Sequence, residues 1–172
     1  MTKKSIFVVC VLLISLTISG CTLFNPTMPV KTPIDLSKAG SVVEAEFWMP
    51  TDDRIVLDLC FVIDRPGEGK RLYEKLQHLD KPSLTMQTLK IPLKIQIKKH
   101  LSSDKDELWL ERIYQTDDLS STSSKYIDRT IDRLSIKSGS YLIRVENINP
   151  FPQFGKNPVE IRIYYSRPPL LW

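Results

Sequence analysis

Residues 89–100 read LKIPLKIQIKKH, and apolar side chains recur at every second position from Leu89 to Ile97. A period of two is typical of a β-strand with one face on the core and the other toward solvent. Pro92 lies on the outward parity and lacks the amide hydrogen that a sheet ladder requires. We therefore expect this strand to lie at the edge of its sheet or to contain a bulge.

The same alternation recurs along the chain between short turn-forming segments. It predicts further strands over residues 41–49, 54–64, 107–116, 141–147 and 159–166. Leucines at helical spacing predict one short amphipathic helix over residues 70–79, outside the sheet. Tyr126–Ile136 fits either two helical turns or a strand. Six to seven strands with one short helix predict a mainly β domain, a β-sandwich of the Ig-like or jelly-roll-like type.

The N-terminus has the features of an export signal. Lys3 and Lys4 precede the apolar residues 6–18, a run too short to span a bilayer comfortably. The segment ends in ISGC, and this motif resembles the lipobox of bacterial lipoprotein signal peptides. The resemblance implies cleavage between Gly20 and Cys21 and attachment of lipid to the Cys21 thiol. The alternative is an ordinary secretory signal that happens to contain a cysteine.

This interpretation divides the chain into three parts: a signal peptide (1–20), a lipidated cysteine with a proline-containing tether (21–35), and a β-sandwich domain (36–172). The lipobox resemblance also implies sorting to the outer membrane, because Thr22 and not aspartate follows the cysteine. The domain would then face the periplasm. Cys10 is lost with the signal, so Cys60 has no internal partner for a disulfide and is expected to be a small packing residue.

The sequence contains no recognisable catalytic, metal or cofactor motif. His78 and His100 have no neighbouring carboxylate or cysteine at metal-ligand spacing, and there is no Gly-x-Ser-x-Gly nucleophile elbow. The formal charge of +4 falls to +2 when Lys3 and Lys4 leave with the signal. This weak and mixed balance argues against nucleic-acid binding. We therefore expect a protein that is not an enzyme, with no catalytic residue, no metal site and no cofactor.

Two groups of residues are candidates for contact with a partner. Lys90, Lys94 and Lys98 share one face of their strand. They form either a basic stripe for anionic lipid or an acidic protein, or a guard against pairing at a sheet edge, which is the interpretation we favour. The tryptophans form the second group, because two lie on the parity opposite the core residues of their strands and one ends the chain. These residues are Trp48, Trp109 and Trp172. Trp172 either packs on the domain, which we favour, or anchors a partner.

Two segments resemble a family of small, uncharacterised proteobacterial lipoproteins. They are residues 35–47, DLSKAGSVVEAEF, and residues 138–145, SGSYLIRV, with Leu134 before them. The resemblance implies a β-sandwich domain of unknown activity. Some lipoproteins of this kind are encoded beside type VI secretion effectors and act as immunity proteins. The resemblance therefore implies a membrane-anchored, non-catalytic protein-binding module, and in its most specific form an immunity protein against a toxin effector. The alternative is an envelope accessory lipoprotein that binds glycan or lipid, which predicts aromatic residues exposed on one face.

Overall fold

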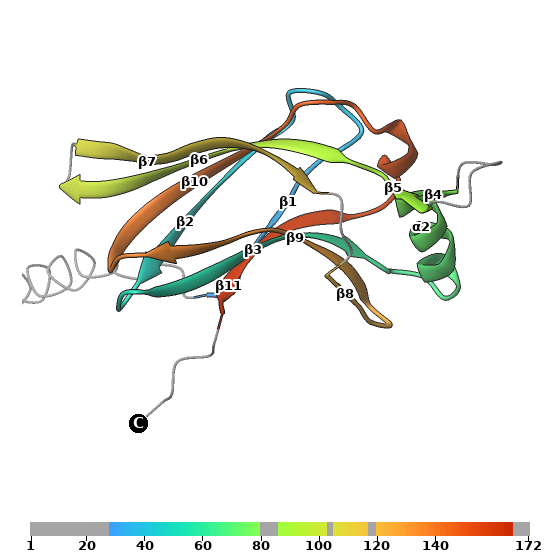
Figure 1. Ribbon diagram of the computed structural model, residues 1–172, viewed down its shortest axis with the longest axis horizontal. Helices are drawn as coiled ribbons and strands as arrows, with labels where there is room; N and C mark the ends of the chain where they lie inside the picture. The colour runs from blue at the N-terminus through green and yellow to red at the C-terminus, as the bar shows by residue number, and fades with distance from the viewer. Residues whose placement is uncertain (1–27, 80–85, 103–104, 117–119, 167–172) are drawn as a thin grey trace, which may run out of the picture.

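A computed structural model describes residues 28–79, 86–102, 105–116 and 120–166. Two antiparallel sheets face each other across one hydrophobic core (Figure 1). The predicted β-sandwich is thereby confirmed, and the sheets do not close into a barrel. No helix in the described part of the chain has the length and apolar character needed to cross a membrane.

One sheet has five strands in the order β1-β11-β3-β9-β8, and the other has four in the order β2-β10-β6-β7. The strands of the first sheet are β1 (Val30–Pro33), β11 (Val159–Tyr165), β3 (Asp53–Val62), β9 (Tyr126–Ile136) and β8 (Ser121–Thr122). Those of the second are β2 (Val42–Met49), β10 (Gly139–Asn147), β6 (Ile91–Ser102) and β7 (Lys105–Thr116). A small separate hairpin joins β4 (Gln77–Leu79) to β5 (Met86–Thr88). A short 3₁₀ turn, η1 (Pro152–Phe154), precedes β11.

Six of these strands correspond to the predicted ones, and the ambiguous segment Tyr126–Ile136 is a seventh, strand β9. A register shift opposite Leu57 and Asp58 interrupts its alternation, and this irregularity explains why helix and strand patterns both fitted. The strands that sequence analysis did not predict are β1, β4, β5 and β8. Each has two to four residues, too few to establish a period of two.

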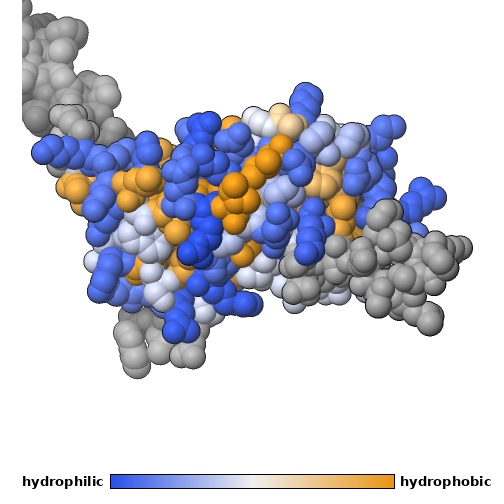
Figure 2. Space-filling model, turned by 45° about the horizontal axis from the view of Figure 1, so that its top comes forward, coloured by the Kyte–Doolittle hydropathy of each residue, from blue (hydrophilic) through white to orange (hydrophobic). Residues whose placement is uncertain are grey.

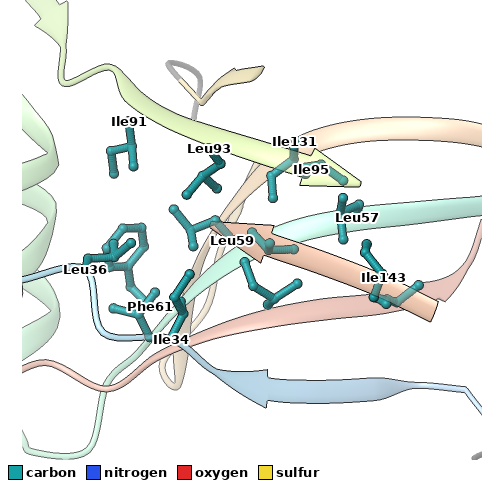
Figure 3. Close-up of a cluster of buried hydrophobic side chains, with 14 of the residues drawn as sticks. Ile34, Leu36, Leu57, Leu59, Phe61, Ile91, Leu93, Ile95, Ile131 and Ile143 are labelled. Atoms are coloured by element: carbon teal, nitrogen blue, oxygen red, sulfur yellow. The ribbon is translucent and has the colours of Figure 1, made fainter. Parts of the chain in front are cut away.

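The core lies between the two sheets. Figure 3 shows side chains of β3, among them Leu57 and Phe61, pointing toward those of β6, among them Leu93 and Ile95. All four are fully buried. Burial of a side chain of this size stabilises the fold by about 1.5–3 kcal/mol. The core therefore depends on the side chains at every second position of both strands, which point inward.

The helix differs from its prediction in extent and place. It is α2 (Glu68–Leu76), and the residues after it form β4. Instead of lying outside the sheet, it lies at one end of the sandwich (Figure 1). Leu72 and Leu76 are fully buried and join the core, so the helix closes that end.

The predicted tether over residues 21–35 is too long. Val30–Pro33 is strand β1 and pairs with β11, with Val30 opposite Ile163. Ile34 and Leu36 are buried in the core, and the Ile34 amide donates a hydrogen bond to the Val159 carbonyl (2.9 Å). The folded domain therefore includes residues from 30 onward, and a tether can extend from Cys21 only to about that position.

Of the two alternatives predicted for residues 89–100, the edge position is wrong, and the irregularities in the β6–β7 pairing lie at Ile97/Lys98 and His100/Ser102, away from Pro92. β6 is central, because it pairs with β10 on one side and β7 on the other. Pro92 is tolerated because β10 pairs with β6 only as far as Leu93, so no β10 residue lies opposite the proline. The edge strands of this sheet are instead β2 and β7.

The two ends of the sandwich differ in what they carry. One end holds α2 (Figure 1). At the other lie the β2–β3 and β9–β10 turns, the end of β6, the starts of β7 and β1 and the end of β11. We call this the β1 end of the sandwich.

Candidate binding surface

The outer face of the four-stranded sheet carries a group of exposed apolar side chains. Trp48, Leu108 and Ile113 are 40%, 52% and 58% exposed, and half-buried Leu142 lies among them on the same face. We call these four residues the outer-face patch. Figure 2 looks toward this side of the molecule and shows apolar side chains lying between hydrophilic ones.

The strand register explains why these residues share a face. Lys98 lies opposite Leu108 on one side and opposite Leu142 on the other. These three residues form one row across the sheet, since residues paired directly across a sheet point to the same side. Ile113 lies opposite Lys94 two rows further along the sheet, and the row of Gln96 and Glu111 lies between them. The inward neighbours on β6, Ile95 and Ile97, are fully buried.

Ion pairs lie between Ile113 and the other apolar residues of the patch. Lys94 Nζ lies 2.7 Å from Glu111 Oε1, and Arg144 Nη1 donates to Glu44 Oε1 at 2.9 Å. The hydrogen bond with Glu111 raises the pKa of Lys94, and the same bond lowers the pKa of Glu111. Both pairs are solvated, so they contribute little to stability but fix the charge pattern of the face.

A shallow hollow of about 170 Å³ lies within this face. Its lining includes both signs of charge beside the apolar Leu142: Glu44, Gln96, Lys98 and Arg144. The surface therefore offers a partner apolar contact together with donors and acceptors, a composition common at protein interfaces.

The three candidate lysines do not form a basic stripe. Lys94 is paired with Glu111, Lys90 precedes β6 and is exposed, and Lys98 is exposed in the apolar row. Their predicted role as guards of an edge strand is also wrong, because β6 is central. Lys98 is the one whose position places it within the candidate surface.

The two described tryptophans do not share a face. Trp48 is outward, since its neighbours Phe47 and Met49 are buried in the core. Trp109 lies in a bulge, where β6 residues Ile97 and Lys98 face Leu110 and Leu108 and leave it unpaired. Its ring is edge-on to the core residue Tyr141, with centroids 6.4 Å apart. The prediction that both tryptophans point outward is therefore wrong for Trp109, because a bulge re-aims side chains.

Sequence reasoning did not single out the exposed Leu108 and Ile113 or the half-buried Leu142 as candidate surface residues. The signal was present in β7, where Leu108, Trp109 and Leu110 are three apolar residues in a row. Such a run breaks the period of two and indicates a bulge or an exposed apolar side chain. Leu142 lies on the outward parity of β10, opposite to Tyr141, Ile143 and Val145, so the alternation gave its face but not its neighbours across the sheet.

Arg129 of β9 is a buried cation that sequence analysis also missed. It is fully buried, and its guanidinium donates hydrogen bonds to three backbone carbonyls. These are the carbonyls of Thr116 (2.6 Å), Leu76 (3.0 Å) and Leu89. The residue therefore joins β9 to the end of α2, the start of β6 and the end of β7, and its role is structural.

A polar network covers the outer face of the five-stranded sheet. The Arg162 guanidinium lies 3.8 Å from the Tyr126 ring centroid and 3.0 Å from Glu160 Oε2. Beneath this network Cys60 is fully buried, as expected of a packing residue. Burial, together with a hydrogen bond to Asp128, raises the pKa of its thiol well above the ordinary value, so the thiolate is suppressed.

The remaining candidates lie partly outside the described residues. Gly20, Cys21 and Trp172 are among the residues that the structure does not describe, so the lipidation and cleavage predictions stay predictions. Within the described residues, no group of three or more histidine, cysteine or acidic side chains is arranged to hold a metal ion. His100 Nδ1 lies 2.6 Å from Asp106 Oδ1 across the β6–β7 hairpin.

Comparison with known proteins identifies the domain. A family model of a domain of unknown function, DUF5625, matches residues 31–165, which is most of the chain. The chain belongs to the DUF5625 family. The match starts within β1, in agreement with the corrected domain boundary. A crystal structure of a protein from Sulfurospirillum deleyianum is similar, with a TM-score of 0.71 and 27% identity over 81% of this chain and 98% of that one. No curated protein matches the sequence.

Proposed function

We propose that this DUF5625 protein is a membrane-anchored, periplasm-facing module that binds a protein partner and does no chemistry. The observation that carries the proposal is the distribution of exposed apolar side chains. Of the six large ones in the described part of the chain, five lie in the four-stranded sheet, and three of these belong to the outer-face patch. Single exposed apolar residues are ordinary, but a grouped set with a polar surround marks an interaction surface.

The arrangement of charges supports a protein as the partner. The pairs Lys94–Glu111 and Arg144–Glu44 are solvated and lie beside apolar residues that a flat partner surface could cover. Such rim charges set the orientation and specificity of an interface more than its affinity. Affinity would come from burial of Leu108, Ile113 and Trp48.

The finer proposal is an immunity protein that neutralises a secreted toxin at the membrane. It is supported by the resemblance to small lipoproteins encoded beside type VI secretion effectors and by the lipobox at Cys21. Attachment to the outer membrane would raise the concentration of the module where the toxin acts, without any new contact.

The alternative of a glycan-binding accessory lipoprotein gains no support from the tryptophans. A sugar platform requires aromatic rings on one face, whereas Trp48 points outward and Trp109 packs against Tyr141 on the core side. The outer-face patch therefore has one tryptophan, and aliphatic side chains make up the rest of it.

The immunity proposal is tested in cells that lack the protein and are challenged with the toxin encoded beside its gene. Wild-type protein should restore survival, and the double variant Leu108→Glu/Ile113→Glu should not. Lys31→Glu, an exposed change on β1 of the other sheet, is the matched control and should protect fully. Equal survival with and without the protein would refute the immunity proposal.

A further inference from the structure

Strand β7 leaves one of its two edges unpaired. It pairs with β6 on one side, and within the residues that the structure describes no strand pairs with it on the other. The strand has twelve residues and no proline, and residues 108–110 at its centre are apolar. An exposed edge strand of this length and character is a template for pairing with another chain. The charged residues on either side of the apolar centre then determine which strand the edge accepts.

The bulge at Trp109 determines how β7 can pair with a second copy of itself. Residues directly opposite each other in a sheet point to the same side. After the bulge the core-side residues have even numbers, as in Arg112 opposite the buried Ile95. Before the bulge they have odd numbers, as in Glu107, which shares a row with the core residue Tyr141. Two antiparallel copies of β7 therefore match faces when Glu107 of each lies opposite Arg112 of the other.

We propose that two copies of this chain dimerise by antiparallel pairing of their β7 strands in this register. Opposite charges then meet twice across the two-fold axis, Glu107 of each copy with Arg112 of the other, and such cross-strand pairs are stabilising. At the centre, Trp109 of each copy lies opposite Leu110 of the other, on the core side. Trp109 is 38% exposed and Leu110 is half-buried, and neither belongs to the outer-face patch. The dimer thus covers an exposed tryptophan and flanks it with ion pairs, the usual arrangement of an interface centre.

Charge and overlap favour this register over others that match faces. A shift of each strand that brings Asp106 opposite Glu111 sets like charges against each other, which is destabilising. A register centred on Ile113 has no such conflict, but it pairs only residues 110–116 of the two copies and leaves Trp109 uncovered. The proposed register pairs residues 105–114 of both copies.

The symmetry of the dimer keeps the outer-face patch accessible. A two-fold axis that relates neighbouring antiparallel strands is perpendicular to their sheet, so the same face of both copies points to the same side. The two outer-face patches therefore lie in one continuous sheet surface. Both five-stranded sheets, with β1, face the opposite side. Self-association thus goes beyond the proposed function and does not depend on it.

The test uses the chain from Thr22 to Trp172, produced without lipid. The core residues of the described part of the chain lie between Ile34 and Ile163, so this chain retains them all. Sedimentation velocity over a range of concentrations should show a monomer in equilibrium with a dimer. A wild-type chain that stays monomeric at every concentration would overturn the proposal.

Charge exchange tests the contacts within the dimer. Glu107→Arg and Arg112→Glu should each weaken dimerisation on the order of tenfold, because two attractive pairs become repulsive. The double variant Glu107→Arg/Arg112→Glu should dimerise as wild type does, since the charges are exchanged, and Lys31→Glu on β1 should change nothing. A double variant no better than the single ones would overturn the proposal. Circular dichroism verifies that each variant is folded. Glu107→Arg retains the whole outer-face patch, so partner capture by this variant tests the proposed function separately from the dimer.

Disulfide cross-linking tests the register. The proposed pairing sets Leu108 of one copy opposite Glu111 of the other, at the Cα separation of about 4.5–5.5 Å that a disulfide accommodates. A mixture of Leu108→Cys and Glu111→Cys chains should give a linked dimer with one chain of each kind, and neither variant alone should link. The buried Cys60 does not take part. A linked dimer of Ile113→Cys alone, or no link in the mixture, would overturn the register.

Discussion

The guanidinium of Arg129 donates a hydrogen bond to the carbonyl of Leu76, the last residue of α2, with 3.0 Å between Nη2 and O. A cation at this position is favourable because the carbonyls at a helix C-terminus carry partial negative charge. The same side chain also holds the carbonyls of Thr116 and Leu89. One buried residue thus connects the helix that closes the sandwich to β9, to the end of β7 and to the segment before β6.

Replacing Arg129 with methionine should lower the free energy of unfolding by roughly 3–5 kcal/mol. The substitution leaves three carbonyls without these donors, and each buried unsatisfied polar group costs about 1–3 kcal/mol. Urea unfolding monitored by circular dichroism measures the change. Arg129→Lys should be intermediate, because one ammonium cannot reproduce the planar fork. A methionine variant as stable as wild type would show that the three hydrogen bonds add nothing net.

Removal of β1 should destabilise the domain. A chain that starts at Leu36 loses the β1–β11 pairing and the buried side chain of Ile34. Burial of an isoleucine contributes about 1.5–3 kcal/mol, and each lost hydrogen bond about 0.5–1.5 kcal/mol. We expect a fall of about 3 kcal/mol or more relative to a chain that starts at Thr22, measured by urea unfolding. Equal stability of the two chains would show that the residues before Leu36 do not contribute to the folded domain, as the tether prediction for residues 21–35 requires.

Cys60 should not react with thiol reagents in the folded protein. Its side chain is fully buried, and its raised pKa keeps the thiol protonated at neutral pH. A chain from Thr22 to Trp172 treated with a chromogenic disulfide should release no colour in buffer and one equivalent in urea. Rapid release in buffer would mean that the network of Arg162 and Tyr126 opens readily.

The turn at the β1 end should give the domain an acid-sensitive contribution to stability. Asp52 accepts hydrogen bonds from the Ser138 amide (2.8 Å) and from Lys137 Nζ (2.9 Å). The first of these, followed by the second, lowers its pKa below the ordinary 3.8. A depressed folded-state pKa adds stability above the unfolded pKa, and this stability is lost as the pH falls through the folded value. The difference in urea midpoint between wild type and Asp52→Asn should therefore be present at pH 6 and vanish at lower pH. A difference in urea midpoint that does not change with pH would show that the lowered pKa of Asp52 is not the cause of the stabilisation.

The strands with clear alternation were the predictable part of the fold. Burial of one face leaves a period of two in the sequence, and β6, β10 and β11 show it. The alternation could not predict how the strands pair, because the register of a strand and the identity of its neighbouring strands depend on contacts between residues distant in sequence. β6 was therefore placed at an edge on account of Pro92, although the proline lies just beyond the end of its pairing with β10.

The candidate surface was only partly predictable for the same reason. Trp48 follows simple alternation, and its outward position was expected and observed. Trp109 was misplaced because one extra residue in β7 reverses the parity of what precedes it. Leu108 and Leu142 come together only through Lys98, across two strand pairings that no local pattern encodes. Nothing in the sequence indicated that Arg129 is buried, since a charged residue in a strand is normally expected on the surface.

The central claim, that the outer-face patch binds a protein, is tested most directly by quantitative affinity capture. Immobilised chains from Thr22 to Trp172 are exposed to envelope and secreted protein fractions, and bound proteins are counted by mass spectrometry. The account predicts one stoichiometric partner on wild type and on Lys31→Glu, and its loss on Leu108→Glu/Ile113→Glu at unchanged melting temperature. A partner retained equally by all three baits, or no partner on well-folded wild type, would contradict it.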